Sequence, residues 1–117
     1  MTNGWKLSQA CREALIAVHP ARYENIVADH VTLNVGSDQI PFPVCDARII
    51  GRADDGSGVE AMVVEIAGST ARPDGKIWHI TWSLAEGRAA RESNEVIAEL
   101  GWKSVEPAEV DLIASCW

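Results

Sequence analysis

Two segments of the chain alternate apolar and polar residues with the period of a β-strand. In residues 25–35, NIVADHVTLNV, the alternation begins at His30, and in residues 76–84, KIWHITWSL, it begins at Trp78. Side chains of a strand point alternately to the two faces of its sheet. Each segment is therefore predicted to be a strand with one apolar face against a core and one polar face.

Turn residues divide much of the remaining chain into further strands and loops. The apolar runs at 44–53 and 59–68 are joined by DDGSG, which predicts a β-hairpin. The final segment, VDLIASCW at 110–117, is predicted to be another strand. Loops or turns are expected where proline, glycine and aspartate gather, at residues 36–38, 40–44 and 71–75.

Two helices are predicted outside these strands. The first is capped by Ser8 and runs to about His19. Its expected buried face carries residues spaced three and four apart, which are Cys11, Ala14, Leu15 and Val18. The second helix runs from near Ser93 to Gly101, with Ser93 and Asn94 as its cap. Its expected buried residues are Val96, Ile97 and Leu100.

Length and composition bound the class of protein. The 117 residues suffice for one compact domain, 1–117, and the mixture of elements predicts the α+β class. No stretch approaches the roughly 18 apolar residues of a membrane helix, and the N-terminus lacks the pattern of a secretory signal. Three scattered cysteines, Cys11, Cys45 and Cys116, are typical of reduced thiols. A cytoplasmic protein without membrane contact is expected.

The net charge of −7 limits the kind of ligand. Proteins that bind duplex nucleic acid through its phosphates use a basic surface. Because this chain is acidic, a duplex is not expected as a partner. A few directed donors in a pocket can still hold a small anion. A phosphate-bearing ligand is therefore expected to be a small nucleotide or the end of a strand.

The polar faces of the two alternating strands repeat one pattern. His30 is followed two residues later by Thr32, and His79 by Thr81, in a chain with only three histidines. One imidazole can act as general base while a second, protonated, acts as general acid. A threonine hydroxyl can donate a hydrogen bond to a phosphate oxygen. Side by side, the strands would supply an acid, a base and two donors around one phosphorus without a metal or cofactor.

These motifs resemble those of the 2H phosphoesterase superfamily, whose mark is two His-x-Thr/Ser motifs on strands. The similarity rests on HVTL at 30–33 and HITWSL at 79–84. The segment EGRAARESNEVI, which follows the second motif, is similar to the glycine loop and helix-opening Ser-Asn pair of that family. The resemblance extends from about residue 23 to residue 101 and is greatest to the cyclic phosphodiesterase domain of fungal-type tRNA ligases and to small RNA-repair-like relatives.

The resemblance implies a fold, an activity and roles for the motif residues. The fold would be a compact one, with antiparallel sheets in two pseudo-symmetric lobes around a central groove and about two helices outside. The activity would be metal-independent hydrolysis of 2′,3′-cyclic phosphates, on RNA ends or small cyclic nucleotides, to 2′-phosphates. His30 and His79 would be the acid–base pair, with neither assigned as the base, and Thr32 and Thr81 would hold the phosphate.

Further side chains are candidates for substrate contacts. The candidate polar contacts are Arg88 and Arg91, after the second motif, and Ser83, on the predicted face of Thr81. The aromatic residues that could stack on a nucleobase are Tyr23, Phe42 and Trp102. The tryptophans of the second motif, Trp78 and Trp82, alternate with the histidines and are expected in the core.

Two other functions compete with hydrolysis. One is a non-catalytic module of the same fold that binds a phosphorylated RNA end or a protein partner. The other is a metal hydrolase in which His30 and His79 bind a metal with Asp29. Alternation places Asp29 on the face opposite His30, and no multidentate ligand spacing is present, so the metal site is disfavoured.

Overall fold

Two antiparallel β-sheets and two helices make up the computed structural model, which describes residues 1–117. The smaller sheet has the order β3-β1-β8, and its strands in chain order are β1 (Thr2–Leu7), β3 (His30–Val35) and β8 (Leu112–Cys116). The larger sheet has the order β2-β6-β5-β4-β7, and its strands are β2 (Asn25–Ile26), β4 (Ala47–Asp54), β5 (Val59–Ile66), β6 (His79–Leu84) and β7 (Lys103–Glu109). The predicted α+β class is confirmed.

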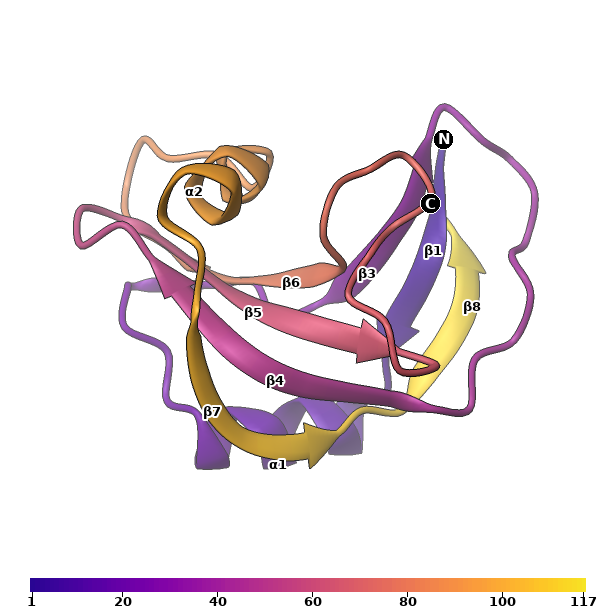
Figure 1. Ribbon diagram of the computed structural model, residues 1–117, viewed down its shortest axis with the longest axis horizontal. Coiled ribbons are helices and arrows are strands. Elements are labelled where there is room, and N and C mark those ends of the chain that lie inside the picture. The colour runs from indigo at the N-terminus through magenta and orange to yellow at the C-terminus, as the bar shows by residue number, and fades with distance from the viewer.

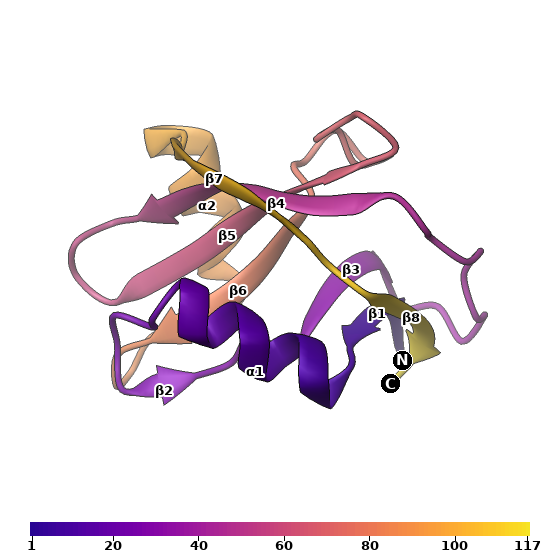
Figure 2. The same ribbon diagram turned by 90° about the horizontal axis from the view of Figure 1, so that it is seen from below.

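The two helices cover opposite faces of the larger sheet. Figures 1 and 2 show α1 (Gln9–Val18) against one face and α2 (Glu92–Leu100) against the other. Ser8 caps α1, since its hydroxyl accepts a hydrogen bond from the Cys11 amide at 3.1 Å, as predicted. The predicted cap of α2 is wrong, because the helix has Arg91 at its N-cap position and no side-chain capping bond.

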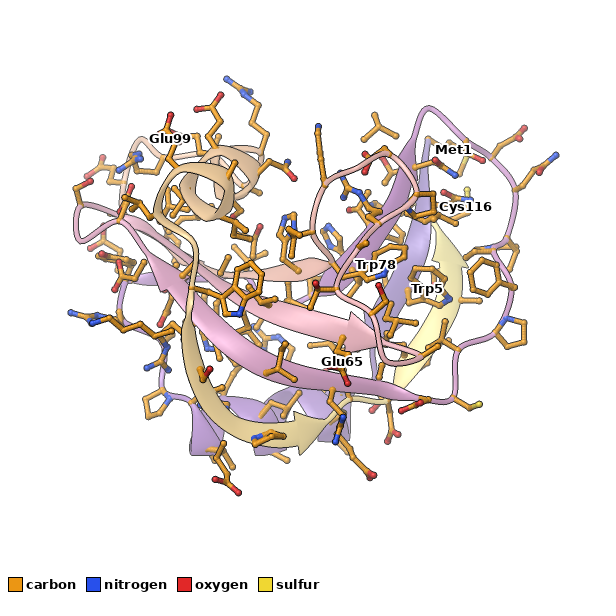
Figure 3. The ribbon with its side chains drawn as sticks, viewed as in Figure 1. Met1, Trp5, Glu65, Trp78, Glu99 and Cys116 are labelled. Atoms are coloured by element: carbon orange, nitrogen blue, oxygen red, sulfur yellow. The ribbon has the colours of Figure 1, made fainter.

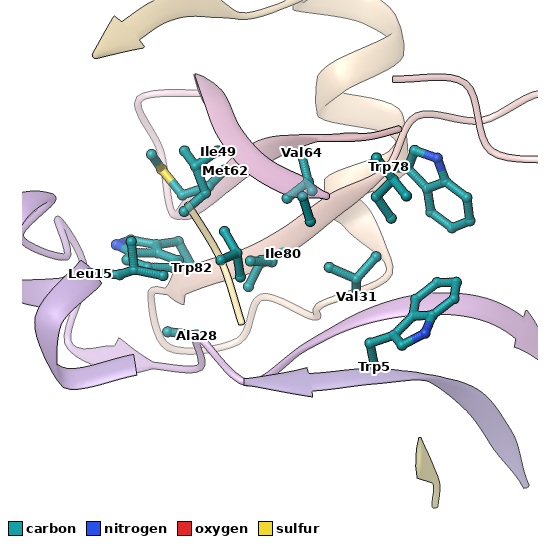
Figure 4. Packing of buried hydrophobic residues seen from close by; sticks show 13 residues of the cluster. Trp5, Leu15, Ala28, Val31, Ile49, Met62, Val64, Trp78, Ile80 and Trp82 are labelled. Atoms are coloured by element: carbon teal, nitrogen blue, oxygen red, sulfur yellow. The ribbon is translucent and has the colours of Figure 1, made fainter. Parts of the chain in front are cut away.

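The larger hydrophobic cluster lies between the two sheets and α1. It contains 13 buried residues, among them Val31 of β3 and Ile80 of β6 (Figure 4). Trp5 of β1 and Trp78 meet edge to face, with ring centroids 5.5 Å apart. The predicted core positions of Trp78 and Trp82 are therefore confirmed. A second cluster, of seven residues, packs Val96 and Ile97 of α2, among others, on the opposite face of the larger sheet.

Some residues expected in the core are exposed. The apolar face predicted for α1 is only partly correct, because Leu15 is buried whereas Ala14 and Val18 are exposed. Leu100, at the end of α2, and Val35, at the end of β3, are also exposed. Val18, Leu100 and Val35 lie at the ends of their elements, where the chain departs from the packed face, whereas Ala14 lies in the middle of α1 on its exposed side.

The predicted strand at 25–35 is divided between the two sheets. Residues Asn25–Ile26 form β2 beside β6, whereas β3 pairs with β1. Between them, buried Ala28 has φ 39°, and its amide donates to the carbonyl of Thr81 at 3.0 Å. The Arg12 guanidinium donates to the carbonyls of Ala28 and Val27, at 3.1 and 3.4 Å. These hydrogen bonds fix the backbone at Val27 and Ala28, where the chain passes from the larger sheet to the smaller one.

Strands β1 and β7 were not predicted. β1 carries Gly4, which sits at a β-bulge and lies close to the backbone of β3. A Cβ atom at position 4 would overlap the carbonyl oxygen of Val31. β7 is an edge strand with mostly exposed side chains and an internal Pro107, so its sequence carries little alternation.

We expect Gly4→Ala to destabilise the protein by about 1–3 kcal/mol, because the added methyl group must displace β3 from β1. Ser115→Ala, on the strand opposite Gly4, is the control and should change stability by less than about 0.5 kcal/mol. Urea unfolding of the two variants measures both values. Equal stabilities would contradict the close packing of β1 on β3.

Candidate functional site

A polar groove of about 490 Å³ brings the two sequence motifs together. Its walls come from β3, β6, the loop at 67–78 and the start of α2, and Thr2 and Trp117 also line it. Its lining residues include all four motif side chains, which are His30, Thr32, His79 and Thr81. Figure 1 shows the elements that carry most of these residues, β3, β6 and α2.

Alternation along the two strands explains why the motif side chains share this groove. Beneath the groove, the opposite face of the strands is apolar, and Val31, Trp78 and Ile80 are buried there. Figure 3 shows Trp5 and Trp78 next to each other in this layer. The burial of one face leaves the imidazoles and hydroxyls on the other face.

His30 is held by a carboxylate. Its Nδ1 lies 3.0 Å from Oδ2 of Asp29, which is also 3.5 Å from the Lys6 ammonium. Burial alone would raise the pKa of Asp29, but the hydrogen bond from His30 and the charge of Lys6 outweigh it and lower that pKa. Because ionised Asp29 only accepts, Nδ1 of His30 carries a hydrogen and Nε2 is the nitrogen left for a ligand.

Asp29 was predicted on the face opposite His30, and this prediction is wrong. β3 begins at His30, so the alternation of the strand does not extend to Asp29, and its carboxylate turns back to the imidazole. Trp117 approaches the same imidazole, with ring centroids 4.6 Å apart. The ammonium of Lys6 lies 5.2 Å from the centroid of the Trp117 ring.

His79 has a different environment. Its Nδ1 lies 2.8 Å from the carbonyl oxygen of Ile77, which can only accept, so Nδ1 is protonated and Nε2 is again free. Burial lowers the pKa of His79, and the positive charges of Arg72, His30 and Lys76 lower it further, against the hydrogen bond to Ile77. At neutral pH, His79 is therefore a neutral imidazole with a lone pair on Nε2.

The two imidazoles are thus electrostatically unlike. Nδ1 of His30 lies against the carboxylate of Asp29, whereas burial and the charge of Arg72 lower the pKa of His79. Pairs of titratable groups in opposed environments are the arrangement that separates an acid from a base. The groove therefore contains two imidazoles in different surroundings, one beside a carboxylate and one with a lowered pKa.

The Thr81 hydroxyl contacts the start of α2. Its Oγ1 lies 2.9 Å from Oγ of the fully buried Ser93 and 3.3 Å from the carbonyl oxygen of Ala90. Ser93, predicted as a helix cap, instead orients the motif threonine. The Thr32 side chain makes no hydrogen bond within the chain, so its hydroxyl is available to a ligand in the groove.

Three cations line the groove. Arg72 is 8% exposed, and its guanidinium forms two hydrogen bonds with the carboxylate of Asp74, at 2.8 and 2.9 Å. It also donates to the carbonyl of Thr32 at 3.4 Å, which ties the loop at 67–78 to β3. Lys76 and Arg91 are exposed on the rim and form no ion pair.

The other sequence candidates lie outside the groove, except Arg91. Arg88 pairs with Asp55 and Glu92, at 2.8 and 3.2 Å. The hydroxyl of Tyr23 donates to Asp54 at 2.6 Å. Phe42 packs on Trp5 in the loop before β4, and Trp102 lines a different cavity.

Ser83 was expected on the face of Thr81, and a β-bulge explains why it is not. Ser83 pairs with Glu60 and Thr81 pairs with Ala61, so Trp82 has no partner of its own in β5. The extra residue turns Ser83 to the opposite face. There its hydroxyl donates to the buried carboxylate of Glu60 at 2.7 Å.

Three residues that line the groove, Arg72, Lys76 and Trp117, were not identified from the sequence. Arg72 was interpreted only as part of a turn, although an arginine beside Asp74 in a proline-glycine turn was a signal that could have been used. Trp117 had no signal, because its place beside His30 depends on the pairing of β8 with β1.

Comparisons of the chain with protein-family models, curated proteins and solved structures gave no match. Neither helix is long and apolar enough to cross a membrane. No three His, Cys, Asp or Glu side chains come together in the arrangement of a metal site.

We expect the lowered pKa of His79 to make folding stability depend on pH. As pH falls below the ordinary histidine value of 6.5, the unfolded chain binds the proton first, so this contribution is complete above pH 6.5 and declines below it. The fall in unfolding free energy between about pH 7.5 and 5.5 should therefore be smaller in His79→Gln than in the wild type. Urea titrations at both pH values measure it, and equal falls would contradict the buried, neutral state of His79.

Proposed function

We propose that the protein is a metal-independent phosphodiesterase of the 2H type that hydrolyses 2′,3′-cyclic phosphates to 2′-phosphates. The observation that carries the proposal is the pair of imidazoles in one groove, each with Nδ1 bound to a protein acceptor and Nε2 left free. The two threonines of the motifs and the rim cations support it. The pseudo-twofold relation of two lobes is part of the same proposal.

In this mechanism His79 is the general base. Its Nε2 takes a proton from the attacking water while the water oxygen bonds to phosphorus. The bond from phosphorus to the 3′ oxygen breaks, and that oxygen receives a proton from Nε2 of His30. The carboxylate of Asp29 accepts the hydrogen of Nδ1 and so orients Nε2 of His30 for this transfer. Exchange of one proton with solvent at each histidine restores the starting state.

The phosphate would be held by donors on both walls. Thr32 donates from β3. Thr81 donates from β6 in place of its 3.3 Å bond to the Ala90 carbonyl, while its oxygen accepts from Ser93. Lys76 and Arg91, without carboxylate partners, add positive charge at the rim. Such fixed donors stabilise the charge that grows on the phosphate oxygens in the transition state. The substrate is a small cyclic nucleotide or an RNA end with a cyclic phosphate.

We expect the pure protein to convert 2′,3′-cyclic AMP, or an RNA with a 2′,3′-cyclic end, to the 2′-phosphate in the presence of EDTA. His30→Ala and His79→Ala should each lower kcat/KM by about 10²–10⁴-fold, the usual value of a general acid or base. His19→Asn is the matched control, since His19 is the one histidine outside the groove. Phosphorus NMR identifies the product.

No product from either substrate between about pH 5 and 9, with a folded wild-type protein, would refute the proposal. Tight binding of a 2′-phosphate without turnover would then favour the non-catalytic module.

The assignment of His79 as the base predicts the acid limb of the pH–rate profile. We expect kcat/KM to rise with pH as His79 loses its proton, with a midpoint below 6.5 because the pKa of His79 is lowered. Arg72→Gln removes a charge that lowers this pKa, so the midpoint should move upward. Lys103→Gln, on β7 and outside the groove, should leave it unchanged. A midpoint that stays in place in Arg72→Gln would contradict the assignment.

A further inference from the structure

One aromatic side chain lines the groove apart from the two imidazoles, and it belongs to Trp117. The proposed hydrolysis gives this residue no role. The aromatic residues that the sequence suggested as partners for a nucleobase all lie elsewhere, namely Tyr23, Phe42 and Trp102. A nucleobase bound in the groove can therefore stack on Trp117 alone among the Trp, Tyr and Phe side chains.

The backbone fixes Trp117 on the smaller sheet. Its amide donates to the carbonyl of Thr2 at 2.8 Å, and its carbonyl accepts from the Thr2 amide at 2.6 Å, so the ladder between β1 and β8 continues by one residue pair. Alternation along β1 places Thr2, Gly4 and Lys6 on one face, and Trp117 shares it. Gly4 has no side chain, so the indole can extend across it toward Lys6. Figures 1 and 2 show the two ends of the chain side by side at this sheet.

One side of the indole rests on two polar residues. Lys6 of β1 and His30 of β3 are cross-strand partners, so their side chains lie next to each other on the same face. The centroid of the Trp117 ring is 5.2 Å from the Lys6 ammonium and 4.6 Å from the centroid of the His30 ring. Trp117 is only half-buried and lines the groove, so the other side of the indole is left for a ligand.

The proposed reaction places the nucleoside on the same wall of the groove. The attacking and leaving oxygens lie roughly in line on opposite sides of phosphorus. The leaving 3′ oxygen belongs to the ribose and takes its proton from His30, whereas the attacking water lies at His79. The ribose therefore lies next to His30, and its base lies within reach of the indole that contacts His30.

We propose that Trp117 is the platform on which the nucleobase of the substrate stacks, with the ribose against His30. This inference rests on the proposed function and on His30 as the acid. Every nucleobase has a flat face that can stack on an aromatic ring, so the platform accepts different bases. It makes cyclic phosphates of nucleosides, rather than cyclic phosphates without a base, the substrates of the groove.

The test compares 2′,3′-cyclic AMP with methyl riboside 2′,3′-cyclic phosphate, in which a methoxy group replaces the base. The ratio of the two kcat/KM values measures the advantage that the base gives. We expect this ratio to fall about tenfold in Trp117→Leu, the usual effect of losing one base–aromatic stack, and to be largely kept in Trp117→Phe, which retains a flat ring. A general disturbance of His30 would lower both kcat/KM values and leave the ratio in place. Trp102→Leu, at a partly exposed tryptophan outside the groove, is the matched control and should leave the ratio unchanged.

A second measurement needs no turnover. The expected product, 2′-AMP, and inorganic phosphate are titrated separately into the full chain, and the indole NH signals of the five tryptophans are followed in ¹H–¹⁵N NMR spectra. Trp117→Phe assigns the signal of Trp117. We expect 2′-AMP to shift this signal in a saturable way, and to bind about tenfold more tightly than inorganic phosphate because of the stacked base.

Three outcomes would overturn the proposal. They are an unchanged ratio in Trp117→Leu, a Trp117 signal that 2′-AMP leaves in place, and equal binding of 2′-AMP and inorganic phosphate. Equal hydrolysis of the two cyclic substrates by the wild type would also remove the platform, and it would leave the phosphodiesterase standing. Absence of hydrolysis together with a Trp117 signal shifted by 2′-AMP would instead remove the hydrolysis and support the platform as part of a binding site.

Discussion

The hydrogen bond from the Ala28 amide to the Thr81 carbonyl is the constraint on which the groove depends. It joins a residue two positions before one motif strand to the middle of the other, although the strands belong to different sheets. Ala28 accepts a positive φ at this point, and the guanidinium of Arg12 binds the carbonyl groups that the turn exposes. The crossing thus places His30 of one sheet and His79 of the other in the same groove.

The same crossing explains why the two histidines differ. It places His30 at the first position of β3, beside Asp29 and within reach of Lys6 on β1. His79 follows the loop that carries Arg72, and burial together with the charge of Arg72 lowers its pKa. The same His-x-Thr pattern therefore has a carboxylate, Asp29, beside its histidine in β3 and a guanidinium, Arg72, near its histidine in β6. The electrostatic difference comes from the two sheets and not from the motifs.

The sequence predicted those features that depend on local periodicity. Alternation was enough to place His30, Thr32, His79 and Thr81 on polar faces, and the cap at Ser8 is a contact between residues three apart. Features that depend on distant segments were missed. The two-sheet division at Ala28 requires a backbone angle that no composition signals, and Trp117 reaches His30 only through the pairing of β8 with β1.

The position of Ser83 shows how one residue of register separates the two faces of a strand. Thr81 faces α2 and the groove, and after the bulge at Trp82 the next polar residue faces the other way. There Ser83 and the Arg22 amide hold one oxygen of Glu60, and the other oxygen of that carboxylate faces Arg52. A regular strand would have left Glu60 without its hydroxyl donor, at a cost of about 1–3 kcal/mol for an unsatisfied buried group. The bulge therefore lets a single strand supply His79 and Thr81 to the groove on one face and orient Glu60 toward Arg52 on the other.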